Sequence, residues 1–151
     1  MLESRKGLVT ESGAEVLACM ASLLTTSNKG TFRLLSNHYP ITQQRYDFCC
    51  NKRLVELGHA VILPIDKDEI KLNGTKYLAN LVVQENADQK ISTEAIAQSL
   101  HELCSFAFEN KIKSVAISSI DNKYHSDIKE LILSMFEKIP GIKIFLYSPT
   151  T

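Results

Sequence analysis

The chain has 151 residues, of which 44% are hydrophobic, and its 17 lysines and arginines are matched by 17 aspartates and glutamates. This length predicts a single domain, residues 1–151, with a core of its own. A formal net charge of zero gives no overall field to attract nucleic acid, and no apolar run reaches roughly 18 residues. We therefore expect neither a nucleic-acid nor a membrane partner.

Four cysteines are present, and two of them, Cys49 and Cys50, are adjacent. They form no Cys-x-x-Cys pair, so their spacing does not predict a zinc site. Met1–Gly7 lacks the apolar segment of a signal peptide. We expect reduced and partly buried thiols, no cofactor and no metal, in an intracellular protein of the nucleus or cytoplasm.

The first half of the chain predicts strands and helices in turn. Met1–Val9 is charged enough to favour an edge strand, whereas Val16–Leu24 is apolar throughout and fits either a buried strand or a helix. Thr31–Asn37 predicts a short helix. Thr42–Leu57 predicts a longer helix that ends at Gly58, because glycine commonly follows the last helical turn.

The centre of the chain predicts a strand, a helix and a second strand. Tyr77–Val83 and Ser114–Ile120 are short and apolar. Between them, Thr93–Asn110 places apolar residues at steps of three and four, and a serine just before it can cap its first turn. Strands joined in this way are normally parallel, and ligands bind beyond their C-terminal ends. We therefore expect chemistry near residues 84–90 and 119–125.

Three further elements complete the pattern. His59–Ile65 predicts a strand that forms a hairpin with the central strand. A polar loop, Asp121–Ser126, precedes a helix at Asp127–Ile139, and Ile142–Tyr147 predicts the last strand. The alternation of elements predicts a three-layer α/β/α sandwich around a mixed sheet of about six strands.

Taken in order, these elements resemble a macro domain. The likeness is strongest at VILPIDKDE (Val61–Glu69), YLANLVVQ (Tyr77–Gln84), SVAISSI (Ser114–Ile120) and IKIFLYSP (Ile142–Pro149), and is looser in the N-terminal half. Within the family, the chain is most similar to the macro domains of the terminal ADP-ribose protein glycohydrolase and of the poly(ADP-ribose)-activated chromatin remodeller. The resemblance implies a cleft above the sheet that binds ADP-ribose, with glycine-rich loops around its diphosphate.

The chain departs from the family at the positions that hold the ligand. The resemblance implies an aspartate after the first strand for the adenine amino group, but here Leu8 follows Gly7 directly and Glu11 is the nearest substitute. The first loop keeps only one glycine, Gly30. The family's glycohydrolases place a nucleophilic lysine where this chain has Gln84, and an amide has no free amine to activate.

The second loop has lost both of its glycines. It consists of Ser118, Ser119, Ile120, Asp121, Asn122 and Lys123, where the family has Pro-Arg-Ile-Gly-x-Gly. A carboxylate at Asp121 would repel a diphosphate, and Lys123 would offset only part of that repulsion. The family's assisting aspartate falls near His125, which could form an acid–base pair with Asp121. The motifs are therefore degenerate relative to the family.

The candidate ligand-binding residues follow from these segments. They are Thr25, Thr26, Ser27, Asn28, Gly30, Gln84, Ser118, Ser119, Asp121, Asn122, Lys123 and His125. Each has a structural alternative, since the same side chains are common in polar loops and at solvated strand ends. Lys90, six residues after Gln84, is a further candidate to replace the missing lysine. We assign no catalytic residue.

The sequence leaves three functions open. The missing lysine, aspartates and glycines together favour a catalytically inactive module, a pseudoenzyme, that binds ADP-ribose, a related nucleotide or ADP-ribosylated protein, or that contacts a protein partner. The second function is an ADP-ribosyl-protein glycohydrolase that removes ADP-ribose from acidic side chains with displaced residues. The third is an unrelated α/β domain or one with a role in assembly.

Overall fold

The computed structural model describes residues 1–119 and 122–148. The strands are β1 (Leu2–Lys6), β2 (Val16–Ser22), β3 (Ala60–Pro64), β4 (Tyr77–Gln84), β5 (Ser114–Ser118) and β6 (Lys143–Ser148). The helices are α1 (Thr31–His38), α2 (Pro40–Asn51), α3 (Thr93–Glu109) and α4 (Asn122–Phe136). Short 3₁₀ helices lie at Val9–Glu11, Thr25–Ser27 and Lys67–Glu69.

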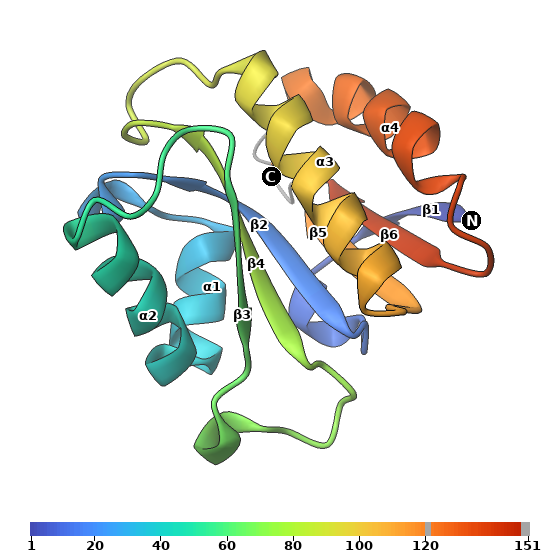
Figure 1. Cartoon of the computed structure of the whole chain (residues 1–151), viewed down its shortest axis with the longest axis horizontal. Helices are drawn as coiled ribbons and strands as arrows, with labels where there is room; N and C mark the ends of the chain where they lie inside the picture. Colours follow the sequence, from blue (N-terminus) through green and yellow to red (C-terminus); the bar gives the residue numbers. More distant parts are fainter. Residues whose placement is uncertain (120–121, 149–151) are drawn as a thin grey trace.

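The strands form one six-stranded sheet in the order β1-β6-β5-β2-β4-β3. All neighbours are parallel except β3 and β4, which are antiparallel. Helices α1 and α2 cover one face and α3 and α4 cover the other (Figure 1). The predicted three-layer sandwich with a mixed sheet of about six strands is therefore confirmed, as are the edge position of the first strand and the hairpin of β3 with β4.

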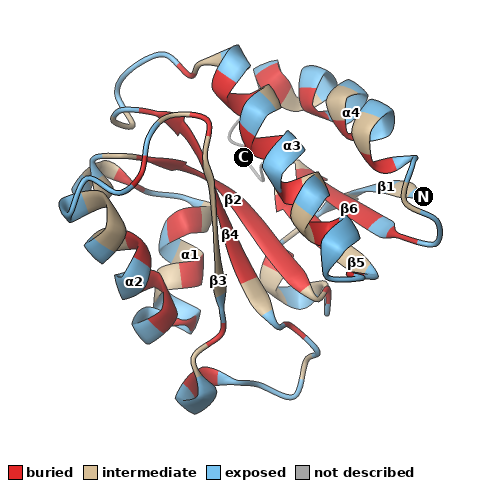
Figure 2. Cartoon of the chain, viewed as in Figure 1, coloured by how far each residue is buried: buried red, intermediate tan, exposed pale blue. Residues whose placement is uncertain are grey.

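β2 lies in the middle of the sheet, and all seven of its residues are buried (Figure 2). A strand covered by helices on both faces is apolar throughout, which is why its pattern alone did not distinguish a strand from a helix. Its side chains alternate between two cores, with Val16, Ala18 and Met20 on the α3–α4 side and Leu17, Cys19 and Ala21 on the α1–α2 side.

The central strand, helix and strand are β4, α3 and β5. They are parallel as predicted, but they are not neighbours, because β2 lies between β4 and β5. The predicted cap of α3 is confirmed, since Ser92 Oγ accepts a hydrogen bond from Ala95 N at 3.1 Å. The C-terminal ends of β2, β4 and β5 consequently meet at one edge of the sheet.

The prediction that the second helix continues to Gly58 is wrong, because α2 ends at Asn51. Arg53 N donates to Cys50 O at 3.0 Å and Leu54 N to Cys49 O at 3.0 Å, and Arg53 has φ +55°. These bonds form a Schellman motif in which arginine occupies the left-handed position that glycine usually takes. Gly58 instead begins the approach to β3.

The predicted polar loop before the last helix is also partly wrong, because α4 begins at Asn122 rather than at Asp127. Tyr124 is 8% exposed and packs in the same core as Ile128 and Ile132. These residues are four positions apart, so the apolar face of the helix extends one turn earlier than the polar composition indicated. Similarly, the first strand ends at Lys6, and Val9 begins a 3₁₀ helix. In the described part of the chain, no helix is long and apolar enough to cross a membrane.

The start of α2 is capped by a residue from a distant segment. Glu69 is 9% exposed, and its carboxylate accepts hydrogen bonds from Ile41 N at 2.7 Å, Thr42 N at 2.8 Å and Thr42 Oγ1 at 2.8 Å. These amides are among the first of the helix and have no partner within it, and negative charge is favourable at this end.

We predict that Glu69→Gln lowers the free energy of unfolding by roughly 1–3 kcal/mol. Ile41 N and Thr42 N bond to different carboxylate oxygens, and the substitution turns one of these oxygens into an NH2 donor and removes the charge. Chemical denaturation measures the change. Asp68→Asn is the matched control, since the exposed Asp68 lies on the same turn. Equal stability of the two variants would contradict the capping role.

Candidate functional site

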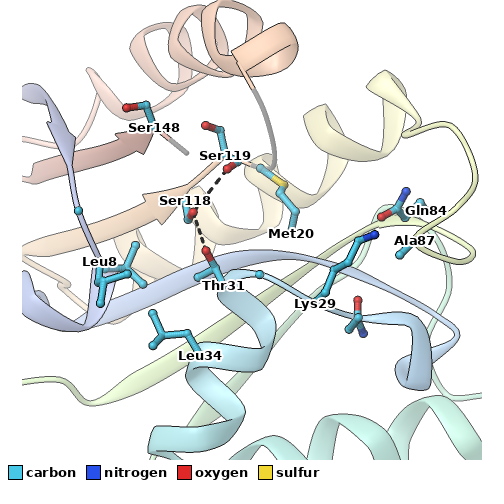
Figure 3. Close-up of a pocket in the computed structure, with 14 residues that line it drawn as sticks. Leu8, Met20, Lys29, Thr31, Leu34, Gln84, Ala87, Ser118, Ser119 and Ser148 are labelled. Carbon is cyan, nitrogen blue, oxygen red and sulfur yellow. Dashed lines mark hydrogen bonds between the residues drawn. The ribbon is translucent and has the colours of Figure 1, made fainter. Parts of the chain in front are cut away.

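A cavity of about 590 Å³ lies at the C-terminal edge of the parallel strands, where sheets of this kind bind ligands. The ends of β2, β4, β5 and β6 form its base, and the segment after β1 and the loop before α1 form its sides (Figure 3). The lining residues are Gly7, Leu8, Val9, Met20, Asn28, Lys29, Gly30, Thr31, Leu34, Gln84, Ala87, Ser118, Ser119 and Ser148.

Several of the predicted ligand-binding residues come together here. Those that line the cavity are Asn28, Gly30, Gln84, Ser118 and Ser119. Those that are described but are not among its lining residues are Thr25, Thr26, Ser27, Lys123 and His125. Asp121 and the side chain of Asn122 lie outside the described residues. A contact of any of these residues with a ligand stays a prediction.

A buried asparagine fixes the loop before α1. Asn28 Oδ1 accepts hydrogen bonds from Ser22 N and Ser22 Oγ, both at 2.9 Å, and its Nδ2 donates to Ser22 O at 3.3 Å. Gly30 then adopts φ +65° and ψ −131°, which glycine reaches without steric cost. The Asn28 side chain is thus engaged with the end of β2, and the loop that it anchors carries Lys29 and Thr31 to the cavity.

Ser27 joins this loop to the one that follows β4. Its Oγ accepts a hydrogen bond from Ala87 N at 3.0 Å and donates to Leu24 O at 2.7 Å. Ala87 lines the cavity, so Ser27 positions part of the wall without reaching the cavity itself. The hydroxyl of Ser27, a candidate ligand-binding residue from the sequence, therefore has a structural use.

Gln84, at the end of β4, is 7% exposed. Its Nε2 donates to Gln89 O at 2.8 Å, which closes the loop of residues 85–90 onto the strand. The other proposed substitutes for family residues, Glu11 and Lys90, are exposed and are not among the residues that line the cavity.

Hydroxyl groups form the wall opposite that loop. Thr31 Oγ1 and Ser118 Oγ lie 2.8 Å apart, so a hydrogen bond joins the start of α1 to the end of β5 (Figure 3). Ser119 Oγ lies 3.2 Å from His125 Nδ1 and donates to Tyr147 O at 3.3 Å. The described partner of His125 is therefore a serine, whereas its predicted pairing with Asp121 lies outside the described residues.

Lys29, which was not among the predicted ligand-binding residues, is the one residue with an ionisable side chain among the described residues that line the cavity. The candidates from this loop were Thr25, Thr26, Ser27, Asn28 and Gly30, but not its lysine. Lys29 points across the cavity toward Gln84 and Ala87 (Figure 3). The signal that could have identified Lys29 in the sequence is its position directly before Gly30. The apolar lining residues Leu8 and Leu34 were missed as well.

The thiol closest in sequence to the cavity floor is unreactive. Cys19 precedes Met20 in β2 and is fully buried, and burial raises the pKa of its thiol to about 12. It is therefore protonated at neutral pH, and it donates to Asn80 Oδ1 at 3.4 Å. Within residues 1–119 and 122–148, no group of three or more His, Cys, Asp and Glu side chains could hold a metal ion.

We predict that Ser27→Ala raises amide hydrogen exchange in residues 86–90 by roughly two- to tenfold, since a single hydrogen bond typically contributes about 0.5–1.5 kcal/mol. Thr26→Ala, at the adjacent exposed position, is the control and should leave exchange unchanged. Mass spectrometry of exchanged peptides measures both variants. If the two variants behaved alike, Ser27 would not hold the loops together.

No family model matches the sequence, and comparison with curated proteins finds no match. Solved structures do match. The macrodomain of Mycobacterium tuberculosis DarG has a TM-score of 0.86 at 19% identity, and that of Thermus aquaticus DarG has 0.84 at 19%, with 99% of each chain covered in both cases.

A third similar structure is Thermosipho africanus DarTG in complex with ADP-ribose. It has a TM-score of 0.82 at 16% identity over 98% of this chain and 41% of that one. At such low identity the comparisons establish the architecture. The chain has the macrodomain fold.

Proposed function

We propose that the chain binds ADP-ribose or a related nucleotide in the cavity beyond the strand ends. The observation that carries this proposal is the cavity of about 590 Å³ at the ligand-binding edge of a macrodomain fold. Its volume falls within the roughly 300–1,000 Å³ of small-molecule sites. A similar solved structure, that of Thermosipho africanus DarTG, is in complex with ADP-ribose, which supports this ligand class.

We further propose that binding occurs without hydrolysis. Gln84 stands where the resemblance implies a nucleophilic lysine, and an amide cannot be activated as an amine can. Its Nε2 is also engaged by Gln89 O at 2.8 Å. On this proposal, the biological ligand is free ADP-ribose or an ADP-ribosylated protein.

A second candidate function is removal of ADP-ribose from acidic side chains. One observation favours it, which is that Lys29 extends from the opposite loop toward Gln84 (Figure 3). Lys29 therefore brings an amine to the side of the cavity where the resemblance implies one. The two candidates share the same ligand and differ only in turnover.

We predict that ADP-ribose at a hundredfold excess over its Kd stabilises the protein by about 2.7 kcal/mol, measured by thermal or chemical unfolding. Ala87→Trp should abolish this stabilisation, because Ala87 lines the cavity and a large ring there displaces the ligand. Ala97→Trp is the control, since Ala97 lies on α3 outside the cavity lining. No stabilisation of the unmodified protein at millimolar ADP-ribose would contradict the proposal.

We also predict that incubation with protein ADP-ribosylated on glutamate releases no ADP-ribose, as measured by chromatography of the soluble products. The second candidate function would instead be established if the unmodified protein released ADP-ribose and the Lys29→Gln variant, while still binding ADP-ribose, did not. Lys90→Gln serves as the control, because Lys90 is exposed on the neighbouring loop and is not among the cavity-lining residues.

A further inference from the structure

The walls of the cavity differ in charge from one end to the other. Lys29 carries the one ionisable side chain among the described lining residues, and it points toward Gln84 and Ala87 (Figure 3). Leu8 is 42% exposed and lines the cavity together with Leu34, so this part of the wall is apolar. A ligand with an anionic part and a flat apolar part matches this arrangement.

Lys29 is available to an anion. The side chain is exposed, and the structure gives it no hydrogen bond or ion pair with any described residue. By contrast, the Asn28 side chain is bonded to Ser22, and the Nε2 of Gln84 donates to Gln89 O. Among the described lining residues, a bound diphosphate would therefore meet the Lys29 ammonium beside neutral groups. Charge-assisted hydrogen bonds of this kind are about twice as strong as neutral ones.

The apolar end offers little to distinguish one base from another. Its side chains, Leu8, Val9 and Leu34, have no hydrogen-bonding atoms. The backbone carbonyls of Leu8 and Val9 already accept hydrogen bonds from Glu11 N at 3.0 Å and Ser12 N at 3.1 Å. Apolar walls discriminate weakly between ligands that differ in one polar group, because no buried partner is left unpaired by the wrong ligand.

We propose that the cavity recognises the negative charge of its ligand through Lys29 and is nearly indifferent to the base. This inference rests on the proposed function and names its specificity. The ligand class is a nucleoside diphosphate linked to ribose, with adenine and hypoxanthine accepted alike. Affinity should also fall as salt is added, because Lys29 is exposed and its attraction to phosphate is screened.

The test is calorimetric titration of the unmodified protein with ADP-ribose, inosine diphosphate ribose and adenosine. We expect the first two to bind within about threefold of each other and adenosine to bind at least tenfold more weakly. A difference above tenfold between the two diphosphate ligands would overturn the inference and leave the proposed function intact. If neither diphosphate ligand bound at millimolar concentration, the proposed function itself would fail.

The matched variants are Lys29→Gln, Lys29→Arg and Lys90→Gln. We expect Lys29→Gln to weaken ADP-ribose binding about tenfold and to reduce its salt dependence, whereas Lys29→Arg and Lys90→Gln should bind like the unmodified protein. Circular dichroism and unfolding curves check that each variant is folded. Unchanged affinity in a folded Lys29→Gln variant would overturn the role of this lysine.

Discussion

Burial of β2 on both faces is the constraint on which the architecture depends. A strand with no solvent-facing side needs a helical layer above and below it, and α1 with α2 and α3 with α4 supply those layers. The chain leaves this doubly covered region at Ser22, and the loop that follows forms part of the cavity wall. The cavity thus lies beyond the point where β2 leaves the layers of helices that cover it.

Around the cavity, several polar side chains form hydrogen bonds with the backbone of neighbouring segments. Asn28 binds the backbone of Ser22, Ser27 binds that of Ala87, and Gln84 binds that of Gln89. These contacts give two loops a defined shape despite their low glycine content. The chain therefore combines a macrodomain fold with cavity walls that are held by side chains. Lys29 differs from the other described lining residues because it is charged and has no hydrogen bond or ion pair with a described residue.

The fold could be predicted from sequence because each central strand and helix has a strong apolar pattern. The limits of two helices were predicted wrongly, because each is an exception to a general sequence rule. Arg53 occupies a helix-ending position that glycine usually takes, and the polar neighbours of Tyr124 concealed the first turn of α4. The site was harder to predict, because its lining depends on which polar side chains form hydrogen bonds with other segments and which face the cavity. Ser27 and Lys29 lie two positions apart in the same polar loop, and only contacts with distant segments show that Ser27 holds a loop while Lys29 lines the cavity.

The capping of α2 by Glu69 connects two segments that are far apart in the chain. Glu69 lies 28 residues after Ile41, and its carboxylate accepts a hydrogen bond from the Ile41 amide. The carboxylate reaches the helix only when the connection between β3 and β4 has folded into its final position. An isolated peptide of residues 40–51 lacks this partner and is too short to be a stable helix in water. We therefore expect α2 to become ordered late during folding, after the hairpin has docked.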